Sequence, residues 1–134
     1  MVDADTVKVK ASSVQKRAGS VSYVAANMLD GDRTTAWNSN GDKVGSGEGV
    51  VLTFTFEGPL RLRGVALLNG YQKTTKDGKN LYKANGRVSG FTVVTDNSTK
   101  EWKVKDSPEP QALEADLGET STVTLTVTGV YPGN

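Results

Sequence analysis

Alternation of apolar and polar residues with a period of two constrains this chain of 134 residues more than any other feature. In "VVLTFTF", residues 50–56, the side chains predicted to share one face are Leu52, Phe54 and Phe56. In "TVTLTVTGV" the matching set is Val123, Leu125 and Val127. Threonines fill most of the alternate positions in both stretches. This pattern is typical of antiparallel strands with one face on a core and the other toward solvent.

Further candidate strands occur along the rest of the chain. They are residues 6–12, 60–69, 88–95, 100–105 and 111–117, separated by turn-forming clusters such as "FEGP", "TDNST" and "DSPEP". Only "YVAANML", residues 23–29, is predicted to be helical, over at most two turns. Many short strands with almost no helix indicate an all-β sandwich, and the length fits a single domain over residues 1–134.

The composition excludes several classes of function. The chain has no cysteine and no histidine, which removes disulfides, thiolate or imidazole metal sites, and Ser-His-Asp catalysis. Any metal ion must therefore be a hard cation bound by oxygen atoms. A net charge of +1 gives no overall attraction to nucleic acid, and no apolar run is long enough for membrane insertion.

The acidic segment "LDGDRTTAW", residues 29–37, has two interpretations. Asp30, Asp32, Thr35 and the carbonyl oxygens of the turn could bind a cation, because hard ions need several such oxygens. The alternative is an Asp-Gly turn whose carboxylates accept backbone N–H groups in front of a buried Trp37. The sequence leaves both open.

Two long connections are the expected location of binding residues, because loops on a rigid β body commonly carry function. They are residues 38–49 and 70–87. The second contains five basic residues and one acidic residue, Asp77, with Tyr71 and Tyr82 interspersed. Such aromatic and cationic groups can hold a ring and an anionic group, whereas the alternative is a solvated loop with its tyrosines packed on the sandwich.

Taken together, these segments resemble a known family. "NMLDGDRTTAWN", "GSGEGVVLTFTF", "GVALLNGYQK", "YKANGRVSGFTVVTD" and "LTVTGVYPGN" are similar to discoidin, or coagulation-factor type C, domains of the galactose-binding-like superfamily. The most similar subgroup is the glycan-binding-like translocation domain of bacterial NAD glycohydrolases. The resemblance covers about residues 6–134 and implies an antiparallel jelly-roll β-sandwich with a ligand site in the loops at one end.

The resemblance also implies roles for individual residues. Asp30, Asp32 and Thr35, with the carbonyl of Asn27, match a structural calcium site. The ligand-binding positions carried over are Trp37, Glu48, Asn69, Tyr71, Tyr82, Asn85 and Arg87. Asn69, Asn85 and Glu48 would bond sugar hydroxyls, and an aromatic ring would face the sugar. Arg87 would pair with Glu48 or with an acidic sugar, or else form an internal ion pair that orders the loops.

One departure from the family pattern concerns the C-terminal end. Family members usually continue past "VYPG" into a last strand bearing Asp and Glu, whose glutamate completes the calcium site. We therefore expect either a sheet that is short of its last strand or a parent protein that ends differently. An open sheet edge of this kind can pair with another protein chain.

These observations predict a non-catalytic binding module, excised from a larger extracellular or cell-surface bacterial protein, that recognises a glycan or surface polymer. The alternative is a protein-interaction or scaffold domain with no sugar site. An enzyme such as a glycosidase is a third class. It is not favoured, because no carboxylate in the sequence is marked as desolvated.

Overall fold

The computed structural model describes residues 4–16, 21–32, 34–37, 39 and 48–133. Its elements are η1 (Ala4–Thr6), β1 (Val7–Ala11), η2 (Ala25–Leu29), β2 (Val51–Leu67), α1 (Leu81–Ala84), β3 (Arg87–Thr95), β4 (Thr99–Lys103) and β5 (Gln111–Tyr131). All strand pairs are antiparallel, and the order across the sheet is β1-β2-β5-β3-β4. The all-β prediction is confirmed.

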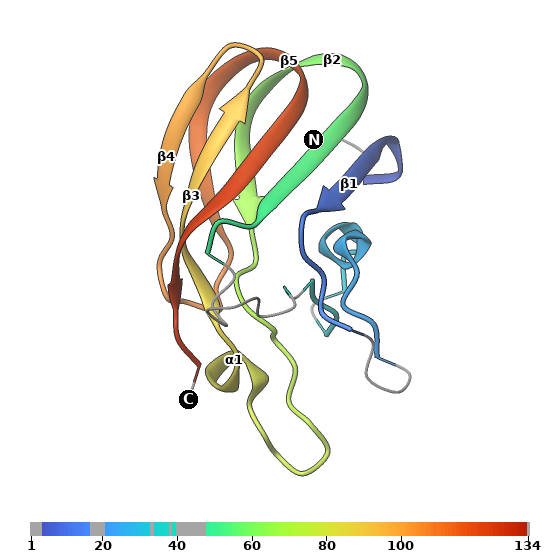
Figure 1. Ribbon diagram of the computed structural model, residues 1–134, viewed down its shortest axis with the longest axis vertical. Helices are drawn as coiled ribbons and strands as arrows, with labels where there is room; N and C mark the ends of the chain where they lie inside the picture. Colours follow the sequence, from blue (N-terminus) through green and yellow to red (C-terminus); the bar gives the residue numbers. More distant parts are fainter. Residues whose placement is uncertain (1–3, 17–20, 33, 38, 40–47, 134) are drawn as a thin grey trace.

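Two long strands build both layers of the sandwich. Figure 1 shows β2 and β5 curling over at one end of the molecule and returning, so that each contributes to both layers. The first half of β2 pairs with residues 122–126 of β5, and its second half pairs with residues 111–120. The registers shift around residues 55–60 and 62–64, where the ribbon bends. The layers are thus continuous through the bend.

This continuity differs from the sequence prediction, which divided β2 at "FEGP" and β5 at residue 117. In β2 the turn-like residues lie within the bulged stretch of the strand and do not end it. In β5, Gly118 lies opposite Leu62 with a φ of 77°, a left-handed conformation that glycine adopts without steric cost. Bulges of this kind bend a strand sharply while its pairing resumes on either side.

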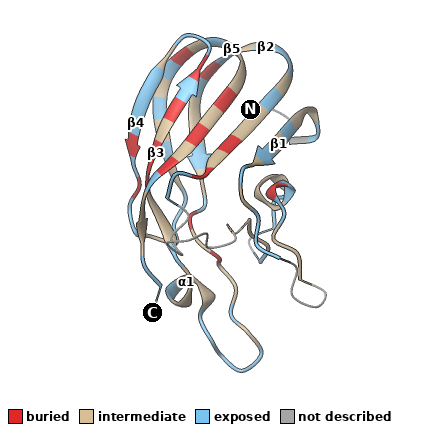
Figure 2. Cartoon of the chain, in the orientation of Figure 1, coloured by how far each residue is buried: buried red, intermediate tan, exposed pale blue. Residues whose placement is uncertain are grey.

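The core lies between the layers. Leu52, Val123, Leu125 and Val127 are buried as the alternation predicted, and Leu117 from the first half of β5 is fully buried in the same cluster. Figure 2 shows buried positions alternating mainly with positions of intermediate exposure along the central strands. Burial of this apolar surface is the main stabilising contribution to the fold.

Loops and α1 occupy the opposite end from the strand bend (Figure 1). The predicted helix at residues 23–29 is a 3-10 helix over Ala25–Leu29. The segment predicted as a loop at residues 70–87 contains α1, whose N-terminus is capped by Asn80: its side chain accepts hydrogen bonds from the backbone N–H groups of Tyr82 and Lys83. Among the described residues, no helix is long and apolar enough to cross a membrane.

Candidate functional site

The acidic segment folds as a turn closed by its own side chains. Asp30 accepts hydrogen bonds from the backbone N–H of Asp32 (2.8 Å) and from the hydroxyl of Thr35 (2.6 Å). Asp32 accepts two from Thr34, at 2.8 Å from the N–H and 2.7 Å from the hydroxyl. The hydroxyl bond from Thr34, followed by the N–H bond, holds the pKa of Asp32 below its ordinary value. We name residues 30–35 the acidic turn.

The donor chemistry of the acidic turn fits a hard cation. Carboxylates of Asp30 and Asp32, the hydroxyl of Thr35 and nearby carbonyl oxygens are ligands that Ca²⁺ accepts. In the part of the chain that the structure describes, no three Asp, Glu, His or Cys side chains cluster as a metal centre. Asn27 donates both amide hydrogens, to the carbonyls of Ser22 (2.9 Å) and Ala36 (3.0 Å), and so ties the turn to η2. The calcium assignment stays a prediction.

A cavity of about 290 Å³ opens beside the acidic turn. Its lining residues are Val21, Ser22, Asn27, Thr34, Thr35, Tyr71 and Lys73. Three of the residues carried over from the family resemblance, Asn27, Thr35 and Tyr71, therefore meet in one place. We name this space the loop cavity.

Tyr71 forms the aromatic wall of the loop cavity. Its side chain is only 5% exposed, and its ring meets Tyr23 edge to face with centroids 6.2 Å apart and planes at 84°. Burial raises the pKa of the Tyr71 hydroxyl, with Tyr23 adding to the shift. The ring is therefore fixed in position before any ligand arrives, which reduces the entropy lost on binding.

Tyr82 and Arg87 belong to a second cluster, organised around Asp106. The Arg87 guanidinium forms a two-pronged contact with the Asp106 carboxylate, at 3.1 Å from Nε and 3.0 Å from Nη2. Tyr82 donates its hydroxyl to the same carboxylate at 2.7 Å, and the guanidinium carbon lies 5.1 Å from the Tyr82 ring centroid. Arg87 thus forms the internal ion pair left open by the sequence, and its partner is Asp106 instead of Glu48.

The contacts in this cluster shift the pKa values of its members in a consistent pattern. Hydrogen bonds from Arg87 and then Tyr82 lower the pKa of Asp106. Burial, then the bond to Asp106, raises the pKa of Tyr82 to about 12. The bond to Asp106 raises the pKa of Arg87 against the effect of burial. All three groups are held in the protonation states that maintain the cluster at neutral pH.

The two candidate asparagines form hydrogen bonds within the protein. Asn69 is 2% exposed, and its amide donates to the carbonyl of Val88 (2.8 Å) and accepts from its N–H (3.1 Å). The side-chain amide of Asn85 donates to the backbone carbonyl of Leu81 at 3.1 Å, and the backbone carbonyl of Asn85 accepts a hydrogen bond from Arg87 at 2.9 Å. The side-chain amide of Asn69 forms two hydrogen bonds with the backbone of β3, and the side-chain amide of Asn85 caps the C-terminal end of α1.

Between Asn69 and Tyr71, Gly70 passes close to the Asp106 cluster. Its φ is 77°, and a Cβ built on it would lie 2.6 Å from Cδ2 of Tyr82 and 2.9 Å from Cγ of Arg87. The chain therefore needs glycine here both for the left-handed backbone and for the lack of a side chain. This residue separates the loop cavity from the Asp106 cluster.

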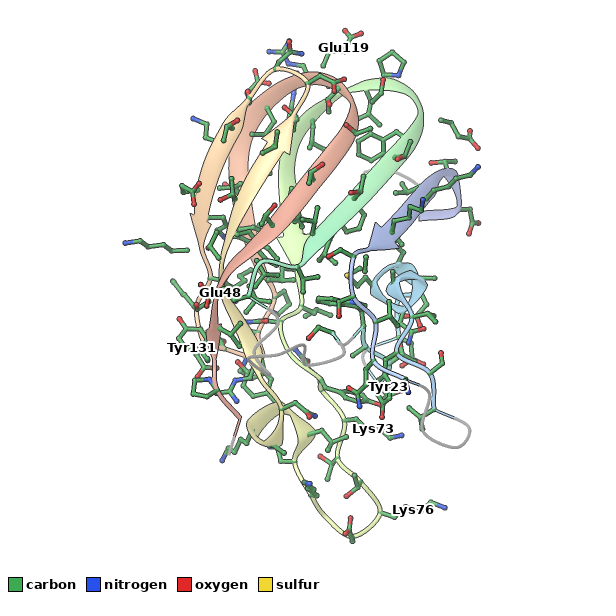
Figure 3. All side chains as sticks on the ribbon, in the orientation of Figure 1. Tyr23, Glu48, Lys73, Lys76, Glu119 and Tyr131 are labelled. Atoms are coloured by element: carbon green, nitrogen blue, oxygen red, sulfur yellow. The ribbon has the colours of Figure 1, made fainter. Side chains whose placement is uncertain are left out.

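Trp37 and Glu48 do not line the loop cavity. Trp37 packs part of its ring against the core, and its indole N–H donates to the carbonyl of Ser13 at 2.8 Å. Glu48 is exposed, and Figure 3 shows it on the Tyr131 side of the molecule, away from Tyr23 and Lys73. Most of the 38–49 connection, to which the sequence analysis gave equal weight, lies outside the described residues.

The sequence analysis missed several residues of both clusters. Lys73 was visible only as one of five cations in its loop, and Tyr23 only as the start of a helix. Asp106 stood in "KDSPEP", which was interpreted as a turn separating two strands. No local pattern connects Asp106 with Arg87, because the two are 19 positions apart.

Comparison with known proteins identifies relatives of the whole fold. The sequence matches the family model described as NAD glycohydrolase translocation F5/8 type C domain over residues 2–134. No curated protein sequence is significantly similar to it. Among solved structures it is similar to the domain CpGH89CBM32-5 from Clostridium perfringens, in complex with GalNAc-β-1,3-galactose. The TM-score is 0.68 at 17% identity, covering 94% of this chain and 86% of that one.

Two further solved structures show the same fold. The family 32 carbohydrate-binding module of C. perfringens NanJ, in complex with galactose, has a TM-score of 0.65 at 14% identity, covering 94% of this chain and 85% of that one. A fragment of a putative chitobiase from Bacteroides thetaiotaomicron has a TM-score of 0.74 at 14% identity, covering 98% and 81%. These likenesses confirm the expected jelly-roll β-sandwich.

Proposed function

Because the chain belongs to the NAD glycohydrolase translocation F5/8 type C domain family, we propose that it is a non-catalytic module that binds glycans through the loop cavity. The observation that carries the proposal is the lining of this cavity. It combines a fixed aromatic ring, Tyr71, with hydroxyl and amide groups from three neighbouring segments. Such a mixture of an aromatic side chain and a few convergent polar groups is typical of sites that bind small polar ligands such as sugars. Similar folds bind galactose and GalNAc-β-1,3-galactose.

Hydrogen bonds stabilise the charged form of several carboxyl groups in this domain. Four carboxyl groups among the described residues have clearly shifted pKa values, those of Asp32, Asp77, Asp106 and Asp116. In each case the pKa is lowered, by hydrogen bonds from Thr34, Thr75, Arg87 and Arg61 respectively. A glycosidase acid requires the opposite shift, a carboxyl group that stays protonated near neutral pH.

The proposal includes a structural calcium ion at the acidic turn and an extracytoplasmic bacterial setting for the parent protein. Asp30, Asp32 and Thr35 would hold the ion, with a carbonyl from Asn27. The ion would stiffen the wall of the loop cavity that Thr34 and Thr35 form. Thermal unfolding of the wild type and of Asp30→Asn with Ca²⁺ or a chelator tests this: only the wild type should gain stability from Ca²⁺. If the wild type unfolds at the same temperature with Ca²⁺ and with the chelator, the proposed calcium site is excluded.

Titration of ¹⁵N-labelled protein with galactose and GalNAc-β-1,3-galactose tests glycan binding. We expect amide shifts at Thr34, Thr35 and Tyr71, with loss of binding in Tyr71→Ala. Tyr131→Phe is the control, since its hydroxyl bonds the carbonyl of Val104 away from the cavity. An array of neutral and acidic glycans that stays blank with and without Ca²⁺ would overturn the proposal.

A protein-interaction module is the second candidate, favoured by the family description, which names a translocation domain. Under this alternative the exposed lysine-rich loop would contact a protein partner. If variants at Tyr71 leave partner capture intact while charge changes at Lys76 and Lys79 abolish it, the interaction role applies.

A further inference from the structure

We infer that the loop cavity selects acidic sugars, with Lys73 binding the carboxylate of a uronic or sialic acid unit. The inference rests on the proposed glycan-binding function and names the class of glycan. It starts from the charge of the lining: among the described residues that line the cavity, Lys73 alone carries a full charge at neutral pH, and the other six are neutral. Asp30 and Asp32 are not among the lining residues.

The neighbouring carboxylates are directed into their own turn. Both oxygens of Asp30 and one of Asp32 accept hydrogen bonds from residues 32–35. The two ion pairs between described residues are Arg61–Asp116 and Arg87–Asp106, so Lys73 belongs to neither. Its ammonium group therefore remains available for an anionic ligand.

Three of the polar residues that line the cavity already use their hydrogens within the protein. Thr34 and Thr35 donate their hydroxyl hydrogens to Asp32 and Asp30, and Asn27 donates both amide hydrogens to carbonyls. These residues are left to accept hydrogen bonds from a ligand, which matches the hydroxyl groups of a sugar. Lys73 supplies donors and charge, which matches a carboxylate. A cavity of about 290 Å³ is at the small end of ligand sites and suits a single ring.

Lys73 also begins a hairpin that carries further cations. Its carbonyl accepts from the N–H of Leu81 at 3.0 Å, and Thr74 bridges Asn80, so the backbone of Lys73 is fixed at the hairpin base. Lys76 lies at the projecting end, as Figure 3 shows, and both Lys76 and Lys79 are exposed. Asp77 is the single acid in the hairpin, and it accepts a hydrogen bond from Thr75. A polyanionic chain held at Lys73 could therefore continue along the hairpin.

The test compares charged and neutral ligands by calorimetry and ¹⁵N NMR. The ligands are galactose, galacturonic acid, N-acetylneuraminic acid, galactose 6-sulfate and polygalacturonate. We expect the carboxylated sugars to bind at least five-fold more tightly than galactose, and Lys73→Gln to remove this preference with a 5- to 20-fold loss, on the order expected for a charged hydrogen bond. Lys73→Arg should retain most of the preference. Lys100→Gln, which removes one charge from the distant strand β4, should change nothing.

Each outcome separates this inference from the proposed function. Galactose binding at the cavity with no gain for carboxylated sugars, or equal acid binding in Lys73→Gln, would overturn the inference and leave glycan binding intact. Tighter binding of the sulfated sugar than of both carboxylated ones would overturn the carboxylate assignment. Absence of shifts with every sugar would overturn both proposals. The double variant Lys76→Gln/Lys79→Gln should bind polygalacturonate more weakly than the wild type does, but should bind galacturonic acid equally well.

Discussion

Replacement of Gly70 by alanine tests how tightly the chain connects the loop cavity and the Asp106 cluster. The new methyl group would meet a left-handed backbone with a φ of 77°, and it would lie 2.6 Å and 2.8 Å from two ring atoms of Tyr82. The left-handed conformation costs about 1–2 kcal/mol for a residue with a Cβ. Forced repacking adds about 1–3 kcal/mol. After the gain from a less flexible unfolded chain, the free energy of unfolding should fall by about 2–4 kcal/mol.

Gly78→Ala is the matched control. Its φ of 87° carries the same backbone penalty, but no atom lies within 4 Å of the added Cβ, so we expect a loss of about 1 kcal/mol or less. For a chain of this length, 1 kcal/mol corresponds to about 4 °C in Tm. Urea and thermal unfolding measure both variants. Equal destabilisation of the two would show that Tyr82 and Arg87 move aside freely, which would refute the reasoning.

Four further predictions concern stability and pH. Asn69→Leu should cost about 1–3 kcal/mol in urea unfolding, because it leaves the N–H and carbonyl of Val88 without their partner; an unchanged midpoint would contradict this. The Tyr82 pKa of about 12, raised by burial and then by Asp106, gives stability that is complete below pH 10 and lost as the pH rises from 10 to 12. The pKa of Asp106 is lowered, first by its hydrogen bond from Arg87. The ionised carboxylate therefore stabilises the fold at any pH above the ordinary pKa of aspartate, and this stability is lost as the pH falls through the lowered pKa of the folded state. In pH-dependent unfolding, Tyr82→Phe should reduce the alkaline loss and Asp106→Asn the acid loss, leaving the share due to Tyr71 and to the other aspartates with lowered pKa values. A profile identical to that of the wild type would exclude the replaced residue as a contributor. Leu117→Ala should cost about 2–5 kcal/mol, since this side chain is fully buried between the layers; a loss below 1 kcal/mol would contradict the packing described.

The sequence predicted the fold well because alternation reports directly on which face a strand buries. The sets at residues 52–56 and 123–127 face the core as expected. The prediction was wrong where turn-forming residues lie inside a strand. Gly58 and Pro59 mark a bulge in β2, and Gly118 marks one in β5, because composition alone does not distinguish a strand that bends from one that ends.

The site was predicted only where residues close in sequence act together. The acidic turn could be anticipated, because its carboxylates bond residues at most five positions away. The role of Arg87 could not be anticipated, because Arg87 begins β3 and its partner Asp106 follows β4, at the other end of the β3–β4 hairpin. Lys73 likewise gains significance only once the fold brings its loop beside the acidic turn.

Because β2 and β5 belong to both layers, the two layers should unfold together. Since β2 and β5 run through the bend, neither layer can peel away as a separate unit without breaking backbone pairing in the other. Amide protons in the central pairs of both layers should therefore exchange with solvent at one common rate under conditions that report global opening. The lysine-bearing hairpin is closed by its own bonds and should open independently. Substitutions in the hairpin should therefore leave the stability of the two layers unchanged.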